Sequence, residues 1–462
     1  MALIKSISGI RGTIGGKPDE GLTPIDILKY TAAFGKWVLE KTGNPTIVIG
    51  RDGRISGEMV RNIVASTLQS IGIHVIDLGL TTTPTVEMAV AMEKAGGGII
   101  ITASHNPKQW NALKLLNHEG EFISGADGEL VLKLGNQLDF DFAEINKLGK
   151  LTLDDSYLQK HIDAILNHPL VDKKAIAERK FSIVVDGINS TGATYVPYLL
   201  KALGVEKIEL INGEVTGNFA HNPEPLPDNL LEISNVVLKQ KADLGIVVDP
   251  DVDRLCFVCD DGGMFGEEYT LVSIADYVLA HNKGNTVSNM SSTRALKDIT
   301  LKHGGEYFAS AVGEVNVVSK MKEVKAVIGG EGNGGIIVPE MHYGRDALIG
   351  IALFLSHLAR YGKSISELRK LYPDYYMSKN KIELDAKVDV QKIFSGIQNM
   401  YKKQPINTED GLKIEFDNEW VHLRTSNTEP IIRIYTESTS ATTAENIAKK
   451  IMLDIRELMK QQ

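Results

Sequence analysis

The sequence predicts three related α/β domains with mainly parallel, mixed sheets, followed by a C-terminal α+β domain. One pattern carries most of this prediction: an apolar β-branched run, a turn containing glycine, a helix-like stretch and another apolar run. It occurs three times, beginning at Thr46, Phe181 and Asn285. Strands that alternate with helices form βαβ units, whose parallel sheets are covered by helices on both faces. The length of 462 residues agrees with several domains, because it exceeds what one hydrophobic core usually organises.

Each repeat contains one helix-like stretch between its two apolar runs, and the end of the chain follows another pattern. After Tyr372-Pro373, three expected strands follow one another without intervening helices, which is typical of an α+β domain. We therefore predict domains at residues 1–150, 151–253, 254–372 and 373–462. The expected helices are at 58–71, 193–203, 294–302, 388–401 and from 443 onward, and the expected C-terminal strands at 379–384, 412–416, 420–423 and 431–436.

The charge and the distribution of apolar residues exclude several classes of protein. A net charge of −9 and a pI near 5.7 argue against a nucleic-acid-binding protein, which would favour a basic face. The first residues lack an apolar core of signal-peptide length, and no stretch approaches the roughly 18 uninterrupted apolar residues of a membrane span. We expect a cytoplasmic protein, monomeric or homodimeric, that binds neither nucleic acid nor a membrane.

The two cysteines, Cys256 and Cys259, lie in the apolar run Leu-Cys-Phe-Val-Cys. A redox Cys-x-x-Cys pair is one interpretation, and two buried strand cysteines are the favoured one. No second Cys or His pair lies at the spacing of a zinc site.

A serine follows the apolar strand that we expect at 98–101. The segment from Thr102 to Pro107 reads Thr-Ala-Ser-His-Asn-Pro. In a parallel sheet, ligands bind at the carboxyl ends of the strands, and a serine there among polar neighbours can be a nucleophile. Ser104 is therefore a candidate nucleophile, and a polar turn ended by Asn-Pro is the structural alternative.

Three carboxylates follow another apolar strand, at 244–248. Asp249, Asp251 and Asp253 alternate with Pro250 and Val252 and precede Arg254. Negative charge crowded in this way is costly unless a hard cation lies among the carboxylates, and such oxygen ligands suit Mg²⁺. An EF-hand loop would need glycine where Arg254 stands and a later bidentate glutamate. We favour a magnesium site, with Arg254 placed to neutralise a phosphoryl group, over a solvated acidic turn.

A glycine-rich segment, 329–335, follows the strand expected at 326–328. It contains G-x-G-x-x-G, but a dinucleotide site needs a helix next, and the following residues are typical of an extended segment. A loop that presents Glu331 and Asn333 to sugar hydroxyls fits better than a nucleotide site. A purely structural glycine turn remains open.

The segment 424–430, Arg-Thr-Ser-Asn-Thr-Glu-Pro, lies between two expected strands of the C-terminal domain. Arginine binds phosphate oxygens with two parallel hydrogen bonds, and hydroxyls and loop amides add further donors. A phosphate site is one interpretation, and a hairpin loop rich in turn formers is the other.

These four motifs, in this order and on four successive domains, resemble those of the α-D-phosphohexomutase family, which includes phosphoglucosamine mutases, phosphomannomutases and phosphoglucomutases. The resemblance covers essentially the whole chain. It extends to the segment 8–12, Ser-Gly-Ile-Arg-Gly, which is similar to the family's N-terminal arginine loop, and to Lys114.

The resemblance implies a deep central cleft to which each domain contributes one motif, and it implies a role for each site residue. Ser104 would carry the phosphoryl group and ligate Mg²⁺ together with Asp249, Asp251 and Asp253. Arg11 and Arg254 would stabilise the transferring phosphoryl group. Lys114 and His105 are the candidates for proton transfer. The remaining residues would bind substrate: Glu331 and Asn333 the sugar hydroxyls, and Arg424, Ser426, Asn427 and Thr428 the other phosphate.

The implied activity is an isomerase that interconverts hexose 6-phosphate and hexose 1-phosphate. Phosphoserine would donate its group to the free hydroxyl, and a hexose 1,6-bisphosphate, the intermediate and activator, would turn over in the cleft. Phosphoglucosamine mutase is the leading activity, with phosphomannomutase or phosphoglucomutase as the alternative. A non-catalytic phosphosugar-binding protein is the alternative from another class, although binding alone would require neither the nucleophile nor the metal ligands.

The chain also departs from frequent forms of the family. The glycine-rich segment 329–335, here called the sugar loop, lacks the histidine of many bacterial members, so His342 either replaces it or is structural. Pro250 and Val252 stand where glycines are frequent, which is expected to stiffen the metal loop.

Overall fold

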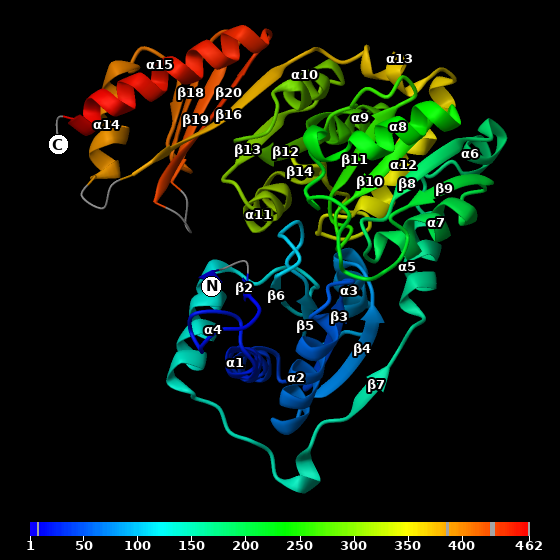
Figure 1. Ribbon diagram of the computed structural model, residues 1–462, viewed down its shortest axis with the longest axis vertical. Helices are drawn as coiled ribbons and strands as arrows, with labels where there is room; N and C mark the ends of the chain where they lie inside the picture. Colours follow the sequence, from blue (N-terminus) through cyan, green and yellow to red (C-terminus); the bar gives the residue numbers. More distant parts are fainter. Residues whose placement is uncertain (7–8, 385–387, 426–429, 461–462) are drawn as a thin grey trace.

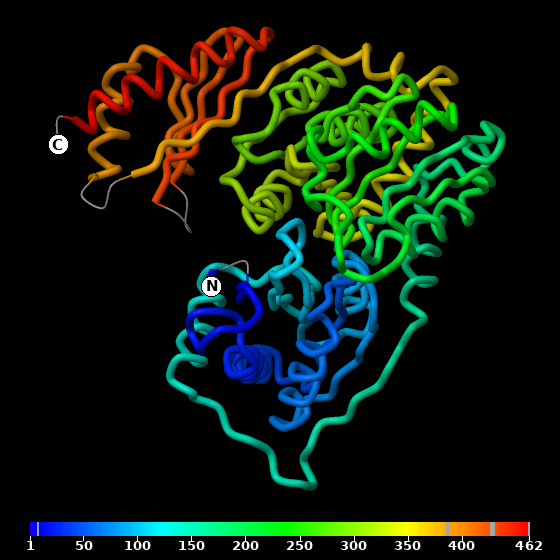
Figure 2. Tube along the Cα trace, in the orientation of Figure 1, coloured from blue at the N-terminus to red at the C-terminus, as the bar shows by residue number. Residues whose placement is uncertain are grey.

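The protein is built on four successive β-sheets, shown by a computed structural model that describes residues 1–6, 9–384, 388–425 and 430–460. We name the four units domains I to IV after their sheets. Figures 1 and 2 show that they follow one another along an arc, with domains I and IV at its two ends. Three α/β units with mixed sheets and a C-terminal α+β unit confirm the predicted fold class. The residue boundaries proposed above remain predictions.

Domain I contains a seven-stranded sheet in the order β1-β2-β6-β5-β3-β4-β7. Strands β5, β3, β4 and β7 are parallel, while β1, β2 and β6 extend the sheet with antiparallel pairs. Every residue of β5 is buried, as expected for a strand covered on both faces. The elements are β1 (Leu3–Ser6), β2 (Gly9–Thr13), α1 (Pro24–Thr42), β3 (Thr46–Arg51), α2 (Gly57–Ser70), β4 (His74–Leu80), α3 (Thr83–Met92), β5 (Gly97–Ile101), β6 (Trp110–Leu116), α4 (Gly125–Gln137) and β7 (Leu151–Leu153).

Domain II contains a four-stranded sheet in the order β11-β10-β8-β9, parallel except for the β10–β11 pair. Strand β11 begins just beyond residue 253 and completes this sheet. The elements from the interdomain segment onward are α5 (Tyr157–Leu166), α6 (Lys173–Arg179), β8 (Ser182–Asp186), α7 (Gly192–Ala202), β9 (Lys207–Ile211), α8 (Leu231–Gln240), β10 (Leu244–Val248) and β11 (Leu255–Cys259).

Domain III repeats this plan in the order β13-β12-β14-β15, with only the β14–β15 pair antiparallel. Its helix α12 is buried along most of its length and shares one hydrophobic core with domain II, where Phe354 stacks on Phe257 with ring centroids 3.8 Å apart. The elements are α9 (Glu267–His281), β12 (Asn285–Asn289), α10 (Ala295–Lys302), β13 (Tyr307–Ser310), α11 (Glu314–Val324), β14 (Ala326–Glu331), β15 (Gly335–Ile337), α12 (Ala347–Tyr361) and α13 (Ile365–Arg369).

Domain IV has an antiparallel sheet in the order β16-β20-β19-β18-β17, with helices α14 and α15 packed together. Figure 1 shows α15 running along the sheet. The predicted strands and helices of this domain are confirmed. They are β16 (Tyr376–Glu383), α14 (Val390–Met400), β17 (Ile406–Asn407), β18 (Leu412–Glu415), β19 (Trp420–Thr425), β20 (Ile431–Ser438) and α15 (Ala441–Lys460).

Two smaller expectations are also decided by the fold. Cys256 and Cys259 are free, buried thiols of β11 that pack in different hydrophobic clusters, which supports the structural interpretation over a redox pair. Within the described ranges, no helix combines the length and apolar character needed to cross a membrane.

Candidate active site

Ser104 lies in the loop that follows β5, at the carboxyl end of the sheet of domain I. Its backbone has a φ of +48°, in the left-handed region that non-glycine residues adopt only occasionally. The Ser104 amide donates to Thr102 Oγ1 at 2.9 Å. The strand and loop therefore hold this serine in one unusual conformation.

Arg54 holds the backbone of the same loop in place. Its side chain is fully buried and pairs with Asp52 at 3.1 Å. The guanidinium also donates to four backbone carbonyls of the loop, those of Ser104, Asn106, Pro107 and Trp110. Because the planar guanidinium presents five donors in a rigid arrangement, one side chain can hold the whole loop.

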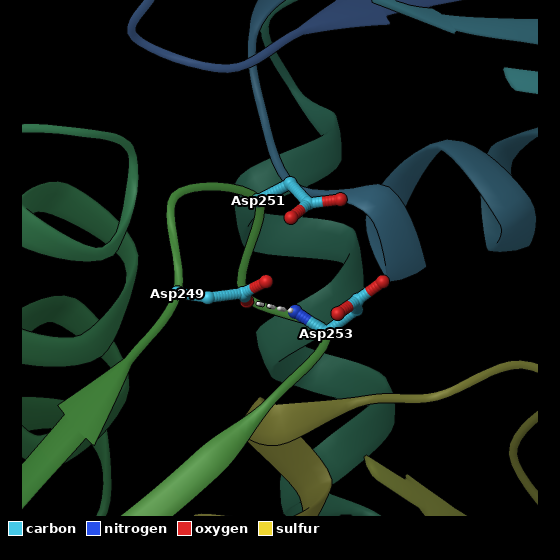
Figure 3. A group of neighbouring side chains, drawn as sticks. All are labelled: Asp249, Asp251 and Asp253. Carbon is cyan, nitrogen blue, oxygen red and sulfur yellow. Dashed lines mark hydrogen bonds between the residues drawn. The ribbon is translucent and has the colours of Figure 1, made fainter. Parts of the chain in front are cut away.

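The metal loop, residues 249–254, lies directly after β10. Its three aspartates lie next to the serine loop, residues 102–107. Figure 3 shows Asp249, Asp251 and Asp253 with their carboxylates close together. Potential ligand atoms of the three lie within 4.8 Å of one another. Ser104 Oγ donates to Asp249 Oδ2 at 2.7 Å, which joins the serine of domain I to the metal loop of domain II. Burial, and then the neighbouring charges of Asp253 and Asp251, raise the pKa of Asp249 well above its ordinary value.

The atoms of the aspartates fit a hard divalent cation. Asp251 Oδ1 and Asp253 Oδ1 are buried and have no hydrogen-bond partner among the described residues. A buried carboxylate oxygen without a partner is costly unless a cation or an ordered donor completes it. The three carboxylates and the hydroxyl of Ser104 are the oxygen donors that Mg²⁺ prefers.

Val252, in the middle of the metal loop, stands at a position where the resemblance described above would favour glycine. Its φ is +61°, which is strained for a β-branched residue. The side chain is fully buried, the amide donates to the carbonyl of Asp249, and the carbonyl accepts from the amide of Ala347. Packing against domain III therefore holds the loop in a conformation that glycine would adopt without strain.

Two cations from other domains neutralise the metal loop. Lys114 Nζ of β6 lies 2.7 Å from Asp251 Oδ2 and 3.2 Å from Asp253 Oδ2. Although burial lowers the pKa of Lys114, the two aspartates raise it overall. Arg345, which precedes α12, lies 2.6 Å from Asp253, 2.7 Å from Glu331 and 3.1 Å from Glu314. Arg345 thus links the metal loop to the sugar loop.

The sugar loop is the tight connection between β14 and β15. Glu331 accepts hydrogen bonds from Asn289 Nδ2 at 2.8 Å and from the amide of Gly313 at 3.2 Å. Asn333 donates to Glu331 Oε2 at 3.5 Å. A strand, β15, follows the glycines where a dinucleotide site would need a helix, so the nucleotide interpretation is wrong.

The phosphate loop, residues 424–430, begins with the last two residues of β19. Arg424 pairs with Asp410 at 2.7 Å. Ser426, Asn427 and Thr428 lie outside the described residues. Arg424 and Arg433 are paired across β19 and β20, which places two cations at this end of domain IV.

Arg11 and Arg254 lie beside the serine loop, which contains His105. Arg11 donates to the side chain of Asn106 at 3.1 Å, while Arg254 lies 3.5 Å from Glu224. Burial, followed by the charge of Arg254, lowers the pKa of His105 well below its ordinary value. The imidazole of His105 is therefore neutral near pH 7.

The serine loop, the sugar loop and the phosphate loop all contribute residues to one cavity of about 440 Å³. This volume is typical of small-molecule sites. Of the predicted site residues, the aspartates of the metal loop lie behind the cavity wall, next to Ser104. Those that line the cavity are Arg11, Ser104, His105, Lys114, Arg254, Glu331, Asn333 and Arg424.

His342 has a structural position away from this cavity. Its imidazole lies 3.3 Å from both Glu87 and Asp346, and Asp346 Oδ2 in turn accepts from His161 Nε2 at 2.9 Å. Burial lowers the pKa of His342, but these carboxylates raise it to about 10 overall. Of the two interpretations of His342, the structural one fits this buried network.

Several residues with contacts to the site were not predicted from the sequence. Arg345 stands one residue before the aspartate that caps α12, and nothing in its local sequence marks it as a partner of Asp253. The threonine run 81–83 carried a weak signal, because the proline that follows it is typical of the first turn of a helix. The other missed residues are Arg54, Thr83, Asn289 and Glu314.

The chain matches four family models that together cover most of its length. They describe phosphoglucomutase/phosphomannomutase alpha/beta/alpha domains I, II and III, at residues 3–140, 159–263 and 266–375, and the C-terminal domain, at residues 379–453.

Individual proteins with known names agree with these models. A "Phosphoglucomutase/phosphomannomutase" of Thermococcus kodakarensis is 38% identical over 93% of this chain and 94% of its own length. A "Phosphoglucosamine/phosphogalactosamine mutase" of Sulfurisphaera tokodaii is 31% identical over 98% of each chain. A crystal structure of a phosphoglucomutase/phosphomannomutase family protein from Burkholderia thailandensis has a TM-score of 0.83 and 26% identity, covering 99% of this chain and 97% of the other.

Replacing Arg345 with methionine tests its role as the shared counter-ion of Asp253, Glu314 and Glu331. Arg345→Met should lower the free energy of unfolding by about 3–5 kcal/mol, because it leaves buried carboxylates without their partner. Urea denaturation measures this loss. The matched control is Arg360→Met, which breaks a half-exposed pair with Asp172 and should cost less than about 1 kcal/mol. Equal losses in the two variants would contradict the role given to Arg345.

Proposed function

The chain belongs to the phosphoglucomutase/phosphomannomutase family, and we propose that it interconverts hexose 6-phosphate and hexose 1-phosphate through a phosphoserine at Ser104. Members of this family are isomerases, and the chain is an enzyme of this class. The preferred substrate in this proposal is glucosamine phosphate.

One observation carries the proposal: Ser104 Oγ lies 2.7 Å from a carboxylate of the buried aspartate triad, and Ser104 also lines the cavity. A serine used only for packing would not need three buried carboxylates beside it. A nucleophile that exchanges a phosphoryl group needs a cation and fixed donors around it, because phosphoryl transfer depends on positioning and charge stabilisation.

The reaction consists of two transfers of the same kind. In the first, the bond between phosphorus and Ser104 Oγ breaks as the free hydroxyl of the hexose monophosphate attacks. The hydroxyl proton leaves to a base, Ser104 Oγ takes up a proton as it departs, and the product is a hexose 1,6-bisphosphate. The bisphosphate turns over in the cavity, and Ser104 then attacks its other phosphate, which returns a monophosphate and the phosphoserine. Lys114 and His105 are the candidates for moving the protons.

Mg²⁺ held by Ser104, Asp249, Asp251 and Asp253 would supply positive charge that stabilises the transferring phosphoryl group. Arg11 and Arg254 line the same part of the cavity and would neutralise its remaining oxygens. At the far end, Arg424 with Ser426, Asn427 and Thr428 would hold the phosphate that is not being transferred. This phosphate site would bind either end of the bisphosphate, because both ends are phosphate groups.

The preference for an amino sugar rests on Glu268. This residue lines the cavity, and its carboxylate packs directly on the sugar loop, since a Cβ at position 332 would lie 1.9 Å from Glu268 Oε2. Burial, opposed by the charge of Lys379, raises the pKa of Glu268 to about 8. The carboxyl is therefore mostly protonated near pH 7. A cationic amino group on a bound sugar would favour its ionised form and pair with it, whereas a hydroxyl would leave Glu268 protonated and gain less. The name of the Sulfurisphaera tokodaii relative agrees with an amino sugar, and that of the Thermococcus kodakarensis relative with the phosphoglucomutase/phosphomannomutase alternative.

Removing the nucleophile tests the phosphoserine directly. Ser104→Ala should lower kcat at least about 1,000-fold, because no other hydroxyl replaces the attacking group. Its free energy of unfolding should change by no more than about 1 kcal/mol, the usual worth of one hydrogen bond. The control is Ser356→Ala, at a buried serine of α12 that donates to the carbonyl of Ala352 and accepts from the amide of Asp172, which should keep full activity. Mutase activity that persists in Ser104→Ala would count against the mechanism, and phosphosugar binding by an inactive wild-type protein would favour the non-catalytic alternative.

The sugar preference requires a comparison of glucosamine, mannose and glucose phosphates by kcat/KM, with Mg²⁺ and a trace of hexose 1,6-bisphosphate. We expect glucosamine phosphate to rank first. Glu268→Gln should lower its kcat/KM relative to glucose phosphate by about 10-fold, since an ionic hydrogen bond becomes a neutral one. An unchanged ratio between the two sugars in Glu268→Gln would remove Glu268 from substrate selection.

A further inference from the structure

Protein groups donate hydrogen bonds to each aspartate of the metal loop. In Asp251 and Asp253, all of the described hydrogen bonds go to the same carboxylate oxygen, Oδ2. Asp251 Oδ2 accepts from Thr83 Oγ1 at 2.6 Å and from Lys114 Nζ at 2.7 Å, while its Oδ1 has no hydrogen-bond partner among residues that the structure describes. Asp253 shows the same division, with Oδ2 bonded to Lys114 and Arg345. The held oxygens fix the planes of the carboxylates and leave the two Oδ1 atoms for a cation.

Among the described donors to the Oδ2 atoms of Asp251 and Asp253, Thr83 is uncharged whereas Lys114 and Arg345 are cations, and Thr83 comes from another domain. It is the first residue of α3 in domain I and is fully buried. Its amide also donates to the backbone carbonyl of Asp251 at 2.9 Å. A single residue of domain I therefore holds both the backbone and the side chain of a residue in the metal loop of domain II.

The local sequence prepares Thr83 for this contact. Thr82 caps α3 by accepting from the amide of Thr85, and proline follows Thr83 in the first turn. The Thr83 amide lies in the first turn, where helical amides lack partners within the helix. The carbonyl of Asp251 satisfies it, so α3 and the metal loop complete each other's hydrogen bonds.

We propose that Thr83 is a positioning residue for the metal, which orients Asp251 so that Oδ1 faces the ion and makes Mg²⁺ binding depend on the docking of α3 against the metal loop. This inference rests on the proposed function, because it takes the aspartate triad as the magnesium site. Residues that bond to the ligands of a metal commonly change its affinity about 10–100-fold when they are removed. Lys114 alone would leave Asp251 less constrained, since its flexible ammonium is shared with Asp253.

The contact also predicts a reciprocal effect. If docking of α3 favours Mg²⁺ binding, then Mg²⁺ must favour docking of α3 by the same free energy. Amides at the start of α3 should consequently exchange their hydrogens more slowly when Mg²⁺ is present.

Calorimetric titration of the metal-stripped, full-length protein with Mg²⁺ tests the proposal, using preparations matched for Ser104 phosphorylation by intact mass. Thr83→Val removes the hydroxyl at nearly constant volume and should weaken Mg²⁺ binding about 10-fold. Thr83→Ser keeps the hydroxyl and should bind as the wild type does. The control is Thr31→Val, at a buried hydroxyl of α1 without a hydrogen-bond partner among the described residues, which should leave affinity unchanged.

The possible outcomes separate this inference from the proposed function. A wild-type protein that binds no Mg²⁺ would overturn both the magnesium site and the role of Thr83. A wild type that binds Mg²⁺ with Thr83→Val within about 2-fold of it would overturn the role of Thr83 alone. Should Thr83→Val fail to fold, hydrogen exchange over residues 83–92 of the wild type decides: slower exchange with Mg²⁺ supports the proposal, and an unchanged rate overturns it.

Discussion

The concentration of negative charge in the metal loop is the constraint on which the rest of the structure depends. Asp249, Asp251 and Asp253 are almost completely buried, and ionised carboxylates removed from water are tolerated only with partners. The loop itself supplies two amides, those of Asp253 and Arg254, which donate to Asp249 Oδ1. Further partners come from domain I, as Lys114, Thr83 and the hydroxyl of Ser104, and from domain III, as Arg345. The same contacts that stabilise the aspartates therefore hold three domains around one point.

Contacts among domains II, III and IV fix the positions of the sugar loop and the phosphate loop relative to the three aspartates. Domains II and III share one hydrophobic core, so the metal loop and the sugar loop belong to a single packed body. Domain IV docks on domain III through the carboxylate of Glu437, which accepts from the amide of Arg294, and through His422, which contacts Ser291. Asp410 pairs with Arg424 and also accepts from the amide of Val312, so the phosphate loop is linked to a segment beside the sugar loop.

The sequence allowed the fold class and the positions of the loops to be predicted, because these features are local. An apolar strand followed at once by polar residues marks a loop at the end of a sheet, and this signal located Ser104 after β5 and Asp249 after β10. The partners of the loops could not be predicted in the same way. Arg54, Thr83 and Arg345 lie 50, 168 and 92 positions from the residues they hold, Ser104, Asp251 and Asp253, and only the folded chain brings them together. His342 resembled a site residue in the sequence, yet its neighbours Glu87 and Asp346 place it in a buried network.

The central claim, that one serine carries the phosphoryl group, is tested most directly by following the phosphate itself. Purified protein would be incubated with Mg²⁺ and hexose 1,6-bisphosphate labelled in both phosphates, and the labelled peptide identified by mass spectrometry. We expect the label on Ser104. When unlabelled hexose monophosphate is added, the label should leave Ser104 and appear on the sugar. Turnover of the monophosphate without label on the protein, or label confined to another residue, would contradict it.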